Sequence, residues 1–574
     1  MAEQHGAAEV KPVIVVGAGP VGLGATLELA RCGVRSILIE RNERTSWHPK
    51  TRNFNTRTME IARGWGREIY DELSGLDLPP NWKSPIRFLD CVVGTETGHV
   101  VSKGFAGAGP DLSPVSSLLS SQDMLEPVML REIKRTGMVD TRFGHELIEI
   151  VRGHEDDATS VEIRARNNET GETYSLTAPA LVAADGAASF VRDFLQIPLD
   201  GPKKIAHFIN CYYFADIEKY VGERSGILLF VSNQKAMGVF QPLDAKGRWL
   251  SQIQVPEDQW STDIFTPERC AQWVRDGVGV QDLEVEVRSV GKWQMNAVVG
   301  RRLIAGRILL TGDAAHMFPP TGGLGANTGM QGMHNAMWKL ALHLKGKAGR
   351  QLLQTYEDER RPVARWVADQ SYHNRQQVNK LGAISRGEVP ADEMGRKDVL
   401  QATRRYGNHI GLELGTIYVS DAVVADGSNP PVVDDPYTDY VPSGHPGARM
   451  PHVWLDRKGE RISTLDLIGP EFSLIAGSKG RDWSRIADAA GRFTGLALQS
   501  HVIGGDLVDV ENTFKARFGL TDTGAVLVRP DGYIAWRATE LKPGSEEALV
   551  NALVSVLALP RQQTAAGTKA KVHA

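Results

Sequence analysis

Three glycines near the start of the chain have the spacing of a loop that binds a dinucleotide. Gly17, Gly19 and Gly22 form a Gly-X-Gly-X-X-Gly pattern. In such a loop the first glycine permits a tight turn, the second lets the backbone approach a pyrophosphate, and the third lets a helix and a strand pack closely. Glu40 follows about 20 residues later, where a carboxylate accepts hydrogen bonds from an adenosine ribose and repels a 2′-phosphate. This chemistry fits FAD, or NAD without an added phosphate; a plain glycine-rich turn is the competing interpretation.

Two further motifs place a carboxylate directly after an apolar run. The first motif, at 181–192, contains Asp185 and Gly186 after its apolar start. The second motif, at 308–316, contains Asp313 after its apolar start. A carboxylate at the end of a strand suits a sugar-alcohol chain, and the loop rich in proline and glycine after Asp313 suits a phosphate or an oxyanion at a helix start. A dehydrogenase that binds NAD alone would leave both motifs without a role. The motifs therefore favour FAD.

A stretch with the pattern of short strands, at about 205–290, supplies candidates for the wall of a substrate pocket. Alternate positions of a strand share a face, so Phe208, Asn210 and Tyr212 are expected to lie together. For each candidate, packing in a core is the competing interpretation. The candidate wall residues are Phe208, Asn210, Tyr212, Phe230, Phe240, Gln241, Trp293 and Met295.

Other catalytic chemistries find less support. His316 lies close to Asp313 and is a candidate base, but a structural role in shaping the loop is favoured. Neither a Ser-His-Asp constellation nor an HExxH zinc motif is recognisable in the sequence. The four cysteines are scattered without a CxxC pair, so neither a disulfide framework nor a metal site is predicted.

The elements that must position these residues begin with a β-α-β unit. Residues 11–16 have the pattern of a buried strand, residues 25–32 that of a helix, and residues 35–40 that of a second strand. Helical periodicity returns at 330–344 and at 352–369. These elements would hold the glycine loop at one end of a parallel sheet.

The remaining elements fall into two groups. Strand-like runs at 208–214, 226–231 and 283–290 predict a sheet-rich insert. A segment rich in proline at 420–450 indicates a linker, and a compact α/β stretch follows at about 450–560. Within that stretch, two apolar runs around Pro530-Asp531-Gly532 predict a hairpin.

Composition excludes several classes of protein. The 574 residues carry a net charge of −4, so there is no basic excess for nucleic acid or an anionic membrane. The apolar run at 12–27 is short for a membrane span and is interrupted by glycines, and residues 1–10 lack the basic start of a signal peptide. A soluble, reduced, cytoplasmic protein is expected.

The three motifs, in this order, resemble the FAD-dependent aromatic hydroxylases. These are single-component flavoprotein monooxygenases with the para-hydroxybenzoate hydroxylase fold, and the resemblance is to the branch of phenol hydroxylase and 2,4-dichlorophenol 6-monooxygenase. It covers about residues 11–385, with weaker matches at 57–60, 121–126, 335–341 and 356–362. The segment 450–560 resembles the thioredoxin-like appendage of this branch, although it contains no cysteine.

This resemblance implies an α/β fold. A Rossmann-like FAD-binding domain would carry an inserted β-sheet substrate domain, and a thioredoxin-like domain would follow at the C-terminus. The expected boundaries are 1–400 for the FAD-binding domain with its insert at about 80–110 and 190–290, 401–450 for the linker, 451–560 for the thioredoxin-like domain and 561–574 for a disordered tail.

The resemblance also assigns roles to individual residues. The residues implied to bind FAD are Gly17, Gly19, Pro20, Gly22, Glu40, Arg41, Lys50, Gln122, Asp185, Gly186, Asp313, Pro320, Gly325, Ala326 and Asn327. The residues implied to act in catalysis are Arg52, Pro320 and Gly323. Lys50 departs from the family, because many members have arginine there, and lysine lacks the bidentate fork.

The implied reaction is hydroxylation of a phenolic or hydroxypyridine ring through a flavin C4a-hydroperoxide. FAD would be bound, NADH or NADPH would donate electrons, and a small aromatic substrate and O2 would react. A homodimer is expected by analogy only. Two alternatives stay open: Baeyer–Villiger insertion or epoxidation of a polyketide-type ring in the same fold, and a flavin-binding scaffold without turnover.

Overall fold

The computed structural model describes residues 10–102, 104–385 and 402–560. The expected disordered tail, 561–574, lies outside these residues. The chain forms two compact units, which are described separately. The larger unit comprises the chain up to residue 338 together with 359–416 and 431–442, and the smaller one comprises 339–358, 417–430 and the chain from 443 onward.

The larger unit is built on a six-stranded sheet with the order β19-β20-β11-β1-β2-β7. Its strands are β1 (Val13–Val16), β2 (Ser36–Glu40), β7 (Val139–Phe143), β11 (Leu181–Ala183), β19 (Ile304–Ala305) and β20 (Ile308–Leu310). All four residues of β1 are buried, as expected for a central strand of branched apolar residues. Because β2, β1, β11 and β20 run parallel, their carboxyl ends meet at one edge, which is where open α/β sheets bind ligands.

Helices and a small sheet complete this part of the unit. The helices are α1 (Pro20–Arg31), α2 (Thr56–Gly64), α3 (Arg67–Ser74), α4 (Gln122–Thr136), α5 (Phe190–Phe194) and α11 (Ile410–Leu414). Helix α8 (Gly325–Leu344) belongs to this unit up to residue 338, and α9 (Arg350–Ser385) belongs to it from residue 359 on. The small antiparallel sheet consists of β8 (His145–Arg152), β9 (Val161–Asn167) and β10 (Thr173–Ala178). Short pairings join β3 (Asn53–Phe54) to β6 (Leu118–Leu119), and β18 (Val298–Gly300) to β12 (Leu199–Asp200) and β21 (His316–Met317).

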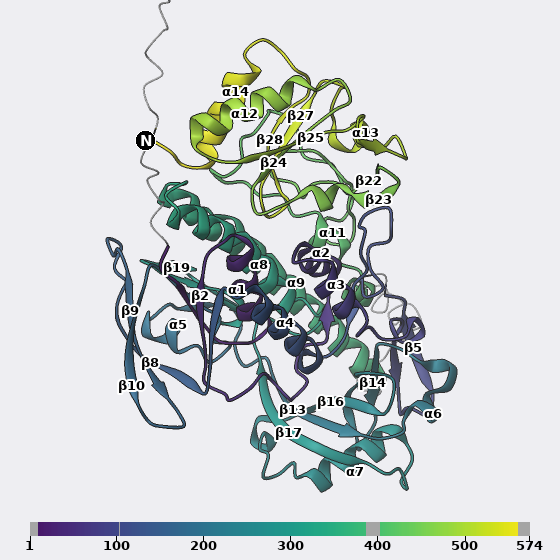
Figure 1. The fold of residues 1–574 in the computed structure, drawn as a ribbon. Coiled ribbons are helices and arrows are strands. Elements are labelled where there is room, and N and C mark those ends of the chain that lie inside the picture. The colour runs from purple at the N-terminus through teal and green to yellow at the C-terminus, as the bar shows by residue number, and fades with distance from the viewer. Residues whose placement is uncertain (1–9, 103, 386–401, 561–574) are drawn as a thin grey trace, which may run out of the picture. The chain divides into compact units, whose positions relative to one another are not determined.

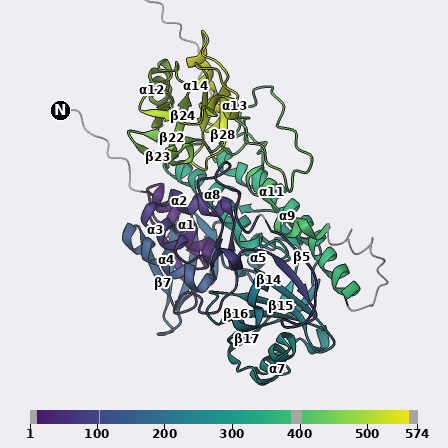
Figure 2. The same cartoon turned by 90° about the vertical axis from the view of Figure 1, so that its right-hand side faces the viewer.

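A second large sheet in the same unit has seven strands in the order β17-β13-β16-β15-β14-β4-β5. Its strands are β4 (Ile86–Leu89), β5 (Glu96–Val100), β13 (Ala206–Phe214), β14 (Leu228–Ser232), β15 (Met237–Pro242), β16 (Arg248–Val255) and β17 (Glu286–Met295), and α6 (Glu218–Val221) lies in the β13–β14 connection. Helix α7 (Pro267–Val278) lies beside this sheet in both ribbon views (Figures 1 and 2). The apolar core between them includes Ile209 and Tyr213 from β13 and Trp273 and Val274 from α7. One face is therefore used for folding, and the other is available for a site.

The smaller unit contains a four-stranded sheet with the order β25-β24-β27-β28. Its strands are β24 (Phe472–Ala476), β25 (Leu498–Val502), β27 (Ala525–Val528) and β28 (Ile534–Ala538). The unit also contains α12 (Asp482–Thr494), α13 (Phe514–Phe518), α14 (Ser545–Val556) and a sheet of β22 (Trp454–Arg457), β23 (Glu460–Ser463) and β26 (Leu507–Asp509). β24 pairs in parallel with β25 and antiparallel with β27, which fits a thioredoxin-like core. The predicted hairpin at 530–532 joins β27 to β28.

Two helices exceed the ranges predicted from periodicity. α8 begins at Gly325 rather than at 330, because its first turn consists of glycine, alanine and asparagine, which carry no apolar stripe. α9 continues to Ser385 and passes through Pro362, whereas periodicity indicates a helix only to 369. This extension brings residues 370–382 of α9 to the substrate side of the unit.

Across the part of the chain that the structure describes, no helix is long and apolar enough to cross a membrane. In the same residues, His, Cys, Asp and Glu side chains form no cluster of three or more that could hold a metal ion.

Candidate active site

The glycine loop joins the end of β1 to the start of α1, at the carboxyl edge of the six-stranded sheet. Gly17 has a φ of +99°, and a Cβ there would lie 2.3 Å from the carbonyl oxygen of Ala184. A Cβ on Gly22 would lie 1.8 Å from the carbonyl oxygen of Gly17. A Cβ on Gly19 would meet no heavy atom within 4 Å. Gly17 and Gly22 are thus required for packing, whereas Gly19 borders open space at the N-terminus of α1.

Helix α1 begins in a way that leaves its first N–H groups facing this open space. Pro20 occupies its first turn, where the missing N–H would have no partner inside the helix. Glu40, at the end of β2, accepts a hydrogen bond from the backbone N–H of Ala18 at 2.8 Å and one from Asn42 at 2.9 Å. The carboxylate predicted to bind a ribose therefore also fixes the loop that precedes the helix.

Lys50 acts on two carboxyl groups near this edge, those of Asp313 and Glu126. Asp313 follows β20, and its side chain reaches solvent. The protein packed around it nevertheless raises the pKa of its carboxyl to about 6, while the charge of Lys50 acts to lower it. Burial raises the pKa of Glu126, on α4, to about 7, and Lys50 again opposes the shift. Gln122 donates to Glu126 at 2.6 Å. A lysine is thus placed within reach of two carboxyl groups that are easily protonated.

Asp185, which follows β11, has both carboxylate oxygens occupied by its own turn. It accepts hydrogen bonds from the hydroxyl of Ser189 at 2.6 Å and from the backbone N–H of Val191 at 3.1 Å. Gly186, beside it, has a φ of +82° and open space in the direction of a Cβ. The carboxylate therefore holds the start of α5, and contact of Asp185 and Gly186 with a cofactor stays a prediction.

The loop that precedes α8 is fixed by the side chain of Asn327. Its Oδ1 accepts hydrogen bonds from the backbone N–H of Asn55 at 2.8 Å and the hydroxyl of Thr58 at 2.7 Å. Its Nδ2 donates to the carbonyl oxygens of Asn53 at 3.0 Å and Gly323 at 2.6 Å. Asn327 is therefore a positioning residue, which leaves the backbone of Gly325 and Ala326 at the helix start for a ligand.

These residues fit the ADP and ribityl portions of FAD. Open space lies in front of Gly19 and Gly325, each at the N-terminus of a long helix, where a Cβ would enter the room that a phosphate or a ring oxygen needs. Glu40 and Asp313 lie at the ends of parallel strands, where they could accept hydrogen bonds from sugar hydroxyls. Arg41, by contrast, is exposed beside this edge, and its contact with the cofactor stays a prediction.

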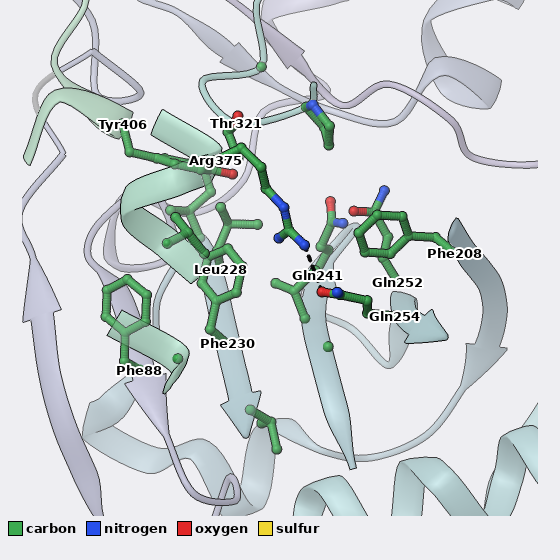
Figure 3. Close-up of a pocket in the computed structure, with 18 of the residues that line it drawn as sticks. Phe88, Phe208, Leu228, Phe230, Gln241, Gln252, Gln254, Thr321, Arg375 and Tyr406 are labelled. Carbon is green, nitrogen blue, oxygen red and sulfur yellow. Dashed lines mark hydrogen bonds between the residues drawn. The ribbon is translucent and has the colours of Figure 1, made fainter. Parts of the chain in front are cut away.

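A cavity of about 320 Å³ lies between the loop before α8 and the open face of the seven-stranded sheet. Pro320 and Gly323 line it from the loop side, together with Lys50 and Arg52. From the sheet side it is lined by residues that include Phe88, Phe208, Phe230, Val239, Gln241, Gln252, Gln254 and Met295. Figure 3 shows the rings of Phe208 and Phe230 on opposite sides of the three glutamine side chains. The cavity thus offers apolar walls and a row of amide groups.

The strand alternation explains which predicted wall residues reach this cavity. Val239 and Gln241 line it, so Phe240 between them must face the other side of the sheet. There Phe240 stacks on Trp273 of α7, with ring centroids 5.1 Å apart. The prediction that Phe240 forms part of the wall is therefore wrong, since it could not share a face with its neighbour Gln241.

Three other predicted residues are absent from the described lining of the cavity. Asn210 accepts a hydrogen bond from the indole of Trp293 at 2.6 Å, and Trp293 stacks on Phe208 with centroids 4.6 Å apart. Tyr212 accepts from Arg248 at 3.1 Å and packs in a separate apolar cluster. Tyr212 shares a face with Phe208, but four residues of strand separate them by about 13 Å. Asn210 and Trp293 support the wall, and Tyr212 lies beyond it.

Arg52 is buried at the side of the cavity with its donors directed to neutral acceptors. Its Nε donates to the amide oxygen of Gln241 at 2.8 Å, its Nη1 to the carbonyl of Pro242 at 3.0 Å, and its Nη2 to the carbonyl of Ile227. Burial lowers the pKa of its guanidinium to about 10, with Tyr406 opposing, so the group remains charged at neutral pH. Arg52 thus contributes positive charge to a largely apolar cavity.

Sequence reasoning missed other residues of the cavity, among them Arg375 and Tyr406. Arg375 on α9 donates to the amide oxygen of Gln254 at 2.7 Å, and Tyr406 follows in a segment expected to be a linker. Burial raises the pKa of Tyr406 above its ordinary value, so its phenol is neutral. The sequence of α9 contains many charged residues, and no pattern in it distinguishes Arg375 from solvent-facing arginines such as Arg365. Arg375 reaches the cavity only because the helix continues past residue 369.

His316 is held away from reactive chemistry. Its ring is buried and stacks on Phe318, with centroids 4.7 Å apart. Burial and the charge of Arg360 lower the pKa of His316 to about 3, so it stays neutral. The structural interpretation of this histidine is therefore favoured over a catalytic base.

Comparison with known proteins identifies the family of the chain. Residues 10–371 match a family described as FAD binding domain, and residues 443–560 match one described as aromatic-ring hydroxylase, C-terminal. The chain is 34% identical to 4-methyl-5-nitrocatechol 5-monooxygenase of Burkholderia sp, over 95% of this chain and 97% of that protein. It is 36% identical to a putative polyketide hydroxylase of Streptomyces halstedii, over 96% and 97%.

A solved structure gives the same result. The flavin-dependent monooxygenase PieE, in complex with FAD and substrate, is similar with a TM-score of 0.88 and 32% identity, over 96% of this chain and 99% of that one. The agreement extends from the glycine loop to the C-terminal unit. The chain belongs to the family of FAD-dependent aromatic-ring hydroxylases.

Proposed function

We propose that the protein uses NAD(P)H and O2 to hydroxylate a phenolic or hydroxypyridine ring in the cavity beside the flavin loop. The observation that carries this proposal is the position of the cavity. Pro320 and Gly323, on the cofactor side, and Phe230 and Gln241, on the sheet side, line the same space. A ring bound there would lie between the flavin and the open face of the seven-stranded sheet.

The sheet side is suited to hold a ring by its faces and its hydroxyl groups. Phe208 and Phe230 offer two aromatic surfaces, and Phe230 is itself stacked on Phe88 with centroids 5.3 Å apart. Gln241 and Gln252 offer amide donors and acceptors between those surfaces. Aromatic pairs add about 0.5–1.5 kcal/mol beyond the burial of their area. The walls therefore orient a ring while they keep water from it.

The charge of Arg52 favours the ionised form of a bound phenol. A positive group close to a phenol lowers its pKa, and a phenolate is more electron-rich at the ring carbons. Arg52 acts through its charge, because all three of its described contacts are to neutral oxygens. Tyr406, neutral and next to Arg52, can donate a hydrogen bond to the ring oxygen. When bound, FAD supplies the electron transfer from NAD(P)H and the activation of O2.

A screen of NAD(P)H oxidation against aromatic rings tests this proposal, with hydrogen peroxide measured alongside. A true substrate accelerates NAD(P)H oxidation and yields hydroxylated ring rather than peroxide. The variant Phe230→Ala should raise the share of peroxide, because it opens the wall to water. Phe190→Ala, at an exposed position of α5, is the matched control and should leave that share unchanged. Failure of every ring to accelerate NAD(P)H oxidation would favour a scaffold without turnover.

The second candidate is oxygen insertion or epoxidation of a polyketide-type ring. The polyketide-type ring is favoured by the 36% identity to the Streptomyces halstedii relative, which is named a putative polyketide hydroxylase, although that name gives hydroxylation as the reaction. The two candidates differ in product, because hydroxylation keeps the carbon skeleton and Baeyer–Villiger insertion opens or expands a ring. Mass and NMR analysis of the product distinguishes them.

Two further features belong to the proposal. A cytoplasmic location is supported by the four cysteines, none of which forms a disulfide in the described chain, since reduced thiols are typical of that compartment. A homodimer is retained from the family resemblance, and light scattering of the purified holoenzyme tests it.

A further inference from the structure

The cavity contains an excess of positive charge. Lys50, Arg52 and Arg375 line it, and no aspartate or glutamate belongs to its described lining. Lys50 has Asp313 and Glu126 within electrostatic reach. The two arginines differ from Lys50, because in the described chain no carboxylate acts on either guanidinium. The charge of this arginine pair is therefore not balanced by the protein.

Arg375 differs from Arg52 in its hydrogen bonds. The donors of Arg52 on Nε, Nη1 and Nη2 all have carbonyl partners. Arg375 is only 6% exposed, yet its Nε has no hydrogen-bond partner among the described residues. Its one described hydrogen bond runs from Nη2 to the amide oxygen of Gln254. In Figure 3 the guanidinium points from α9 toward Gln254 and the neighbouring Gln241.

Such an arrangement is unfavourable unless a ligand completes it. A buried charge without a partner and a buried donor without an acceptor each lower stability. The planar fork of a guanidinium matches the two oxygens of a carboxylate, and it does so better than it matches a single phenolate oxygen. The guanidinium of Arg375 lies 5.6 Å from the ring centre of Phe208, so its partner would be attached to a ring held against that wall.

We infer that the ring substrate carries a carboxylate, which Arg375 binds through its free donors. This inference rests on the proposed function and narrows it to aromatic acids with a hydroxyl group. Arg375 then selects and orients the substrate from the α9 side, while Arg52 acts on the hydroxyl that is to be ionised. The substrate enters as an anion, and the cavity discriminates against neutral rings of the same shape.

Matched pairs of ligands test the inference on the holoenzyme. The probes are 3-hydroxybenzoate against 3-hydroxybenzamide, and 3-hydroxy-2-naphthoate against its amide, with dissociation constants measured from the change in flavin absorption. We expect each acid to bind about 10- to 100-fold more tightly than its amide, the range of a hydrogen bond to a charged group. Arg375→Gln should abolish that preference, and Arg375→Lys should restore part of it. Arg365→Gln, at an exposed position of the same helix, should leave it unchanged.

Several results would overturn the inference. They are equal binding of acid and amide, failure of both acids to bind, and an equal loss for both ligands in Arg375→Gln, which would indicate packing alone. A fourth is dependence on Arg375 for ionised 4-nitrophenol but for neither carboxylate, which would assign the guanidinium to a phenolate.

The inference and the proposed function can fail separately. If neutral phenols are hydroxylated as well as their acids, the function stands and the inference falls. If the acids bind through Arg375 but no ring accelerates NAD(P)H oxidation, the inference stands and the function falls.

Discussion

Replacing Gly19 by valine should remove FAD while leaving the protein folded. The backbone at Gly19 has a φ of −71° and a ψ of 177°, which any residue adopts. No heavy atom lies within 4 Å of the position of a Cβ there, so the new side chain meets no protein atom at its first carbon. It does enter the space from which a pyrophosphate would approach the N-terminus of α1.

The two effects differ in size. At the start of a helix, valine is a poorer cap than glycine by about 1 kcal/mol, so unfolding should change by little more than that. A hydrogen bond between a backbone N–H and a charged phosphate oxygen contributes about 1.5–3 kcal/mol. Displacement of the pyrophosphate by one side chain would break about two of them, or about 3–6 kcal/mol. This corresponds to a roughly 100- to 10,000-fold weaker affinity for FAD.

Two measurements on the same variant separate these effects. The ratio of absorption at 450 nm to that of the protein, followed by titration with FAD, measures binding, and thermal unfolding of the FAD-free protein measures stability. Gly22→Ala is the contrasting variant, because its Cβ would lie 1.8 Å from the carbonyl oxygen of Gly17 and must disrupt the loop itself. A Gly19→Val protein that keeps its yellow colour and its affinity would refute the assignment of this loop to the pyrophosphate.

Three further predictions concern stability. Asn327→Ala removes four hydrogen bonds and leaves the buried N–H of Asn55 without an acceptor, so we expect a loss of about 2–4 kcal/mol in the free energy of unfolding by urea; an unchanged midpoint would contradict the role given to Asn327. The pKa of Glu126 rises from 4.5 to about 7 on folding, so its ionisation destabilises the FAD-free protein as pH rises from about 4.5 through 7. Glu126→Gln removes that penalty, so the free energy of unfolding of the variant relative to that of the native chain should rise by roughly 3 kcal/mol between pH 4 and pH 8. Equal stability of the two proteins at both pH values would count against this expectation. In the C-terminal unit Arg529 is fully buried and pairs with Asp531 at 3.0 Å. Arg529→Met leaves this buried carboxylate without its partner, so it should lower the free energy of unfolding by about 3–5 kcal/mol in calorimetry. The double variant with Asp531→Asn should recover part of that loss.

The cofactor edge was largely predictable from sequence, because its signals are local. The spacing of Gly17, Gly19 and Gly22 requires a strand before it and a helix after it, and the structure contains both. The hairpin around Pro530-Asp531-Gly532 was predictable for the same reason. In each case neighbouring residues determine the backbone, so no knowledge of distant contacts was needed.

The substrate cavity was only partly predictable, because distant segments form it. Alternation could have excluded Phe240 once Gln241 was chosen, but it could not show how far along the strand the cavity extends past Phe208. Arg375 and Tyr406 reach the cavity from a long helix and from a segment rich in loops. Their positions depend on how that helix packs against the sheet, and no local pattern in the sequence encodes this.

Incorporation of labelled oxygen tests the central claim most directly. The holoenzyme is supplied with NAD(P)H, ¹⁸O2 and a ring that accelerates NAD(P)H oxidation, and the product is analysed by mass spectrometry. FAD-dependent ring hydroxylation predicts one ¹⁸O atom in each molecule of product, with about one product formed for each NAD(P)H oxidised. A product without the label, or NAD(P)H oxidation that yields hydrogen peroxide alone with every ring tested, would contradict it.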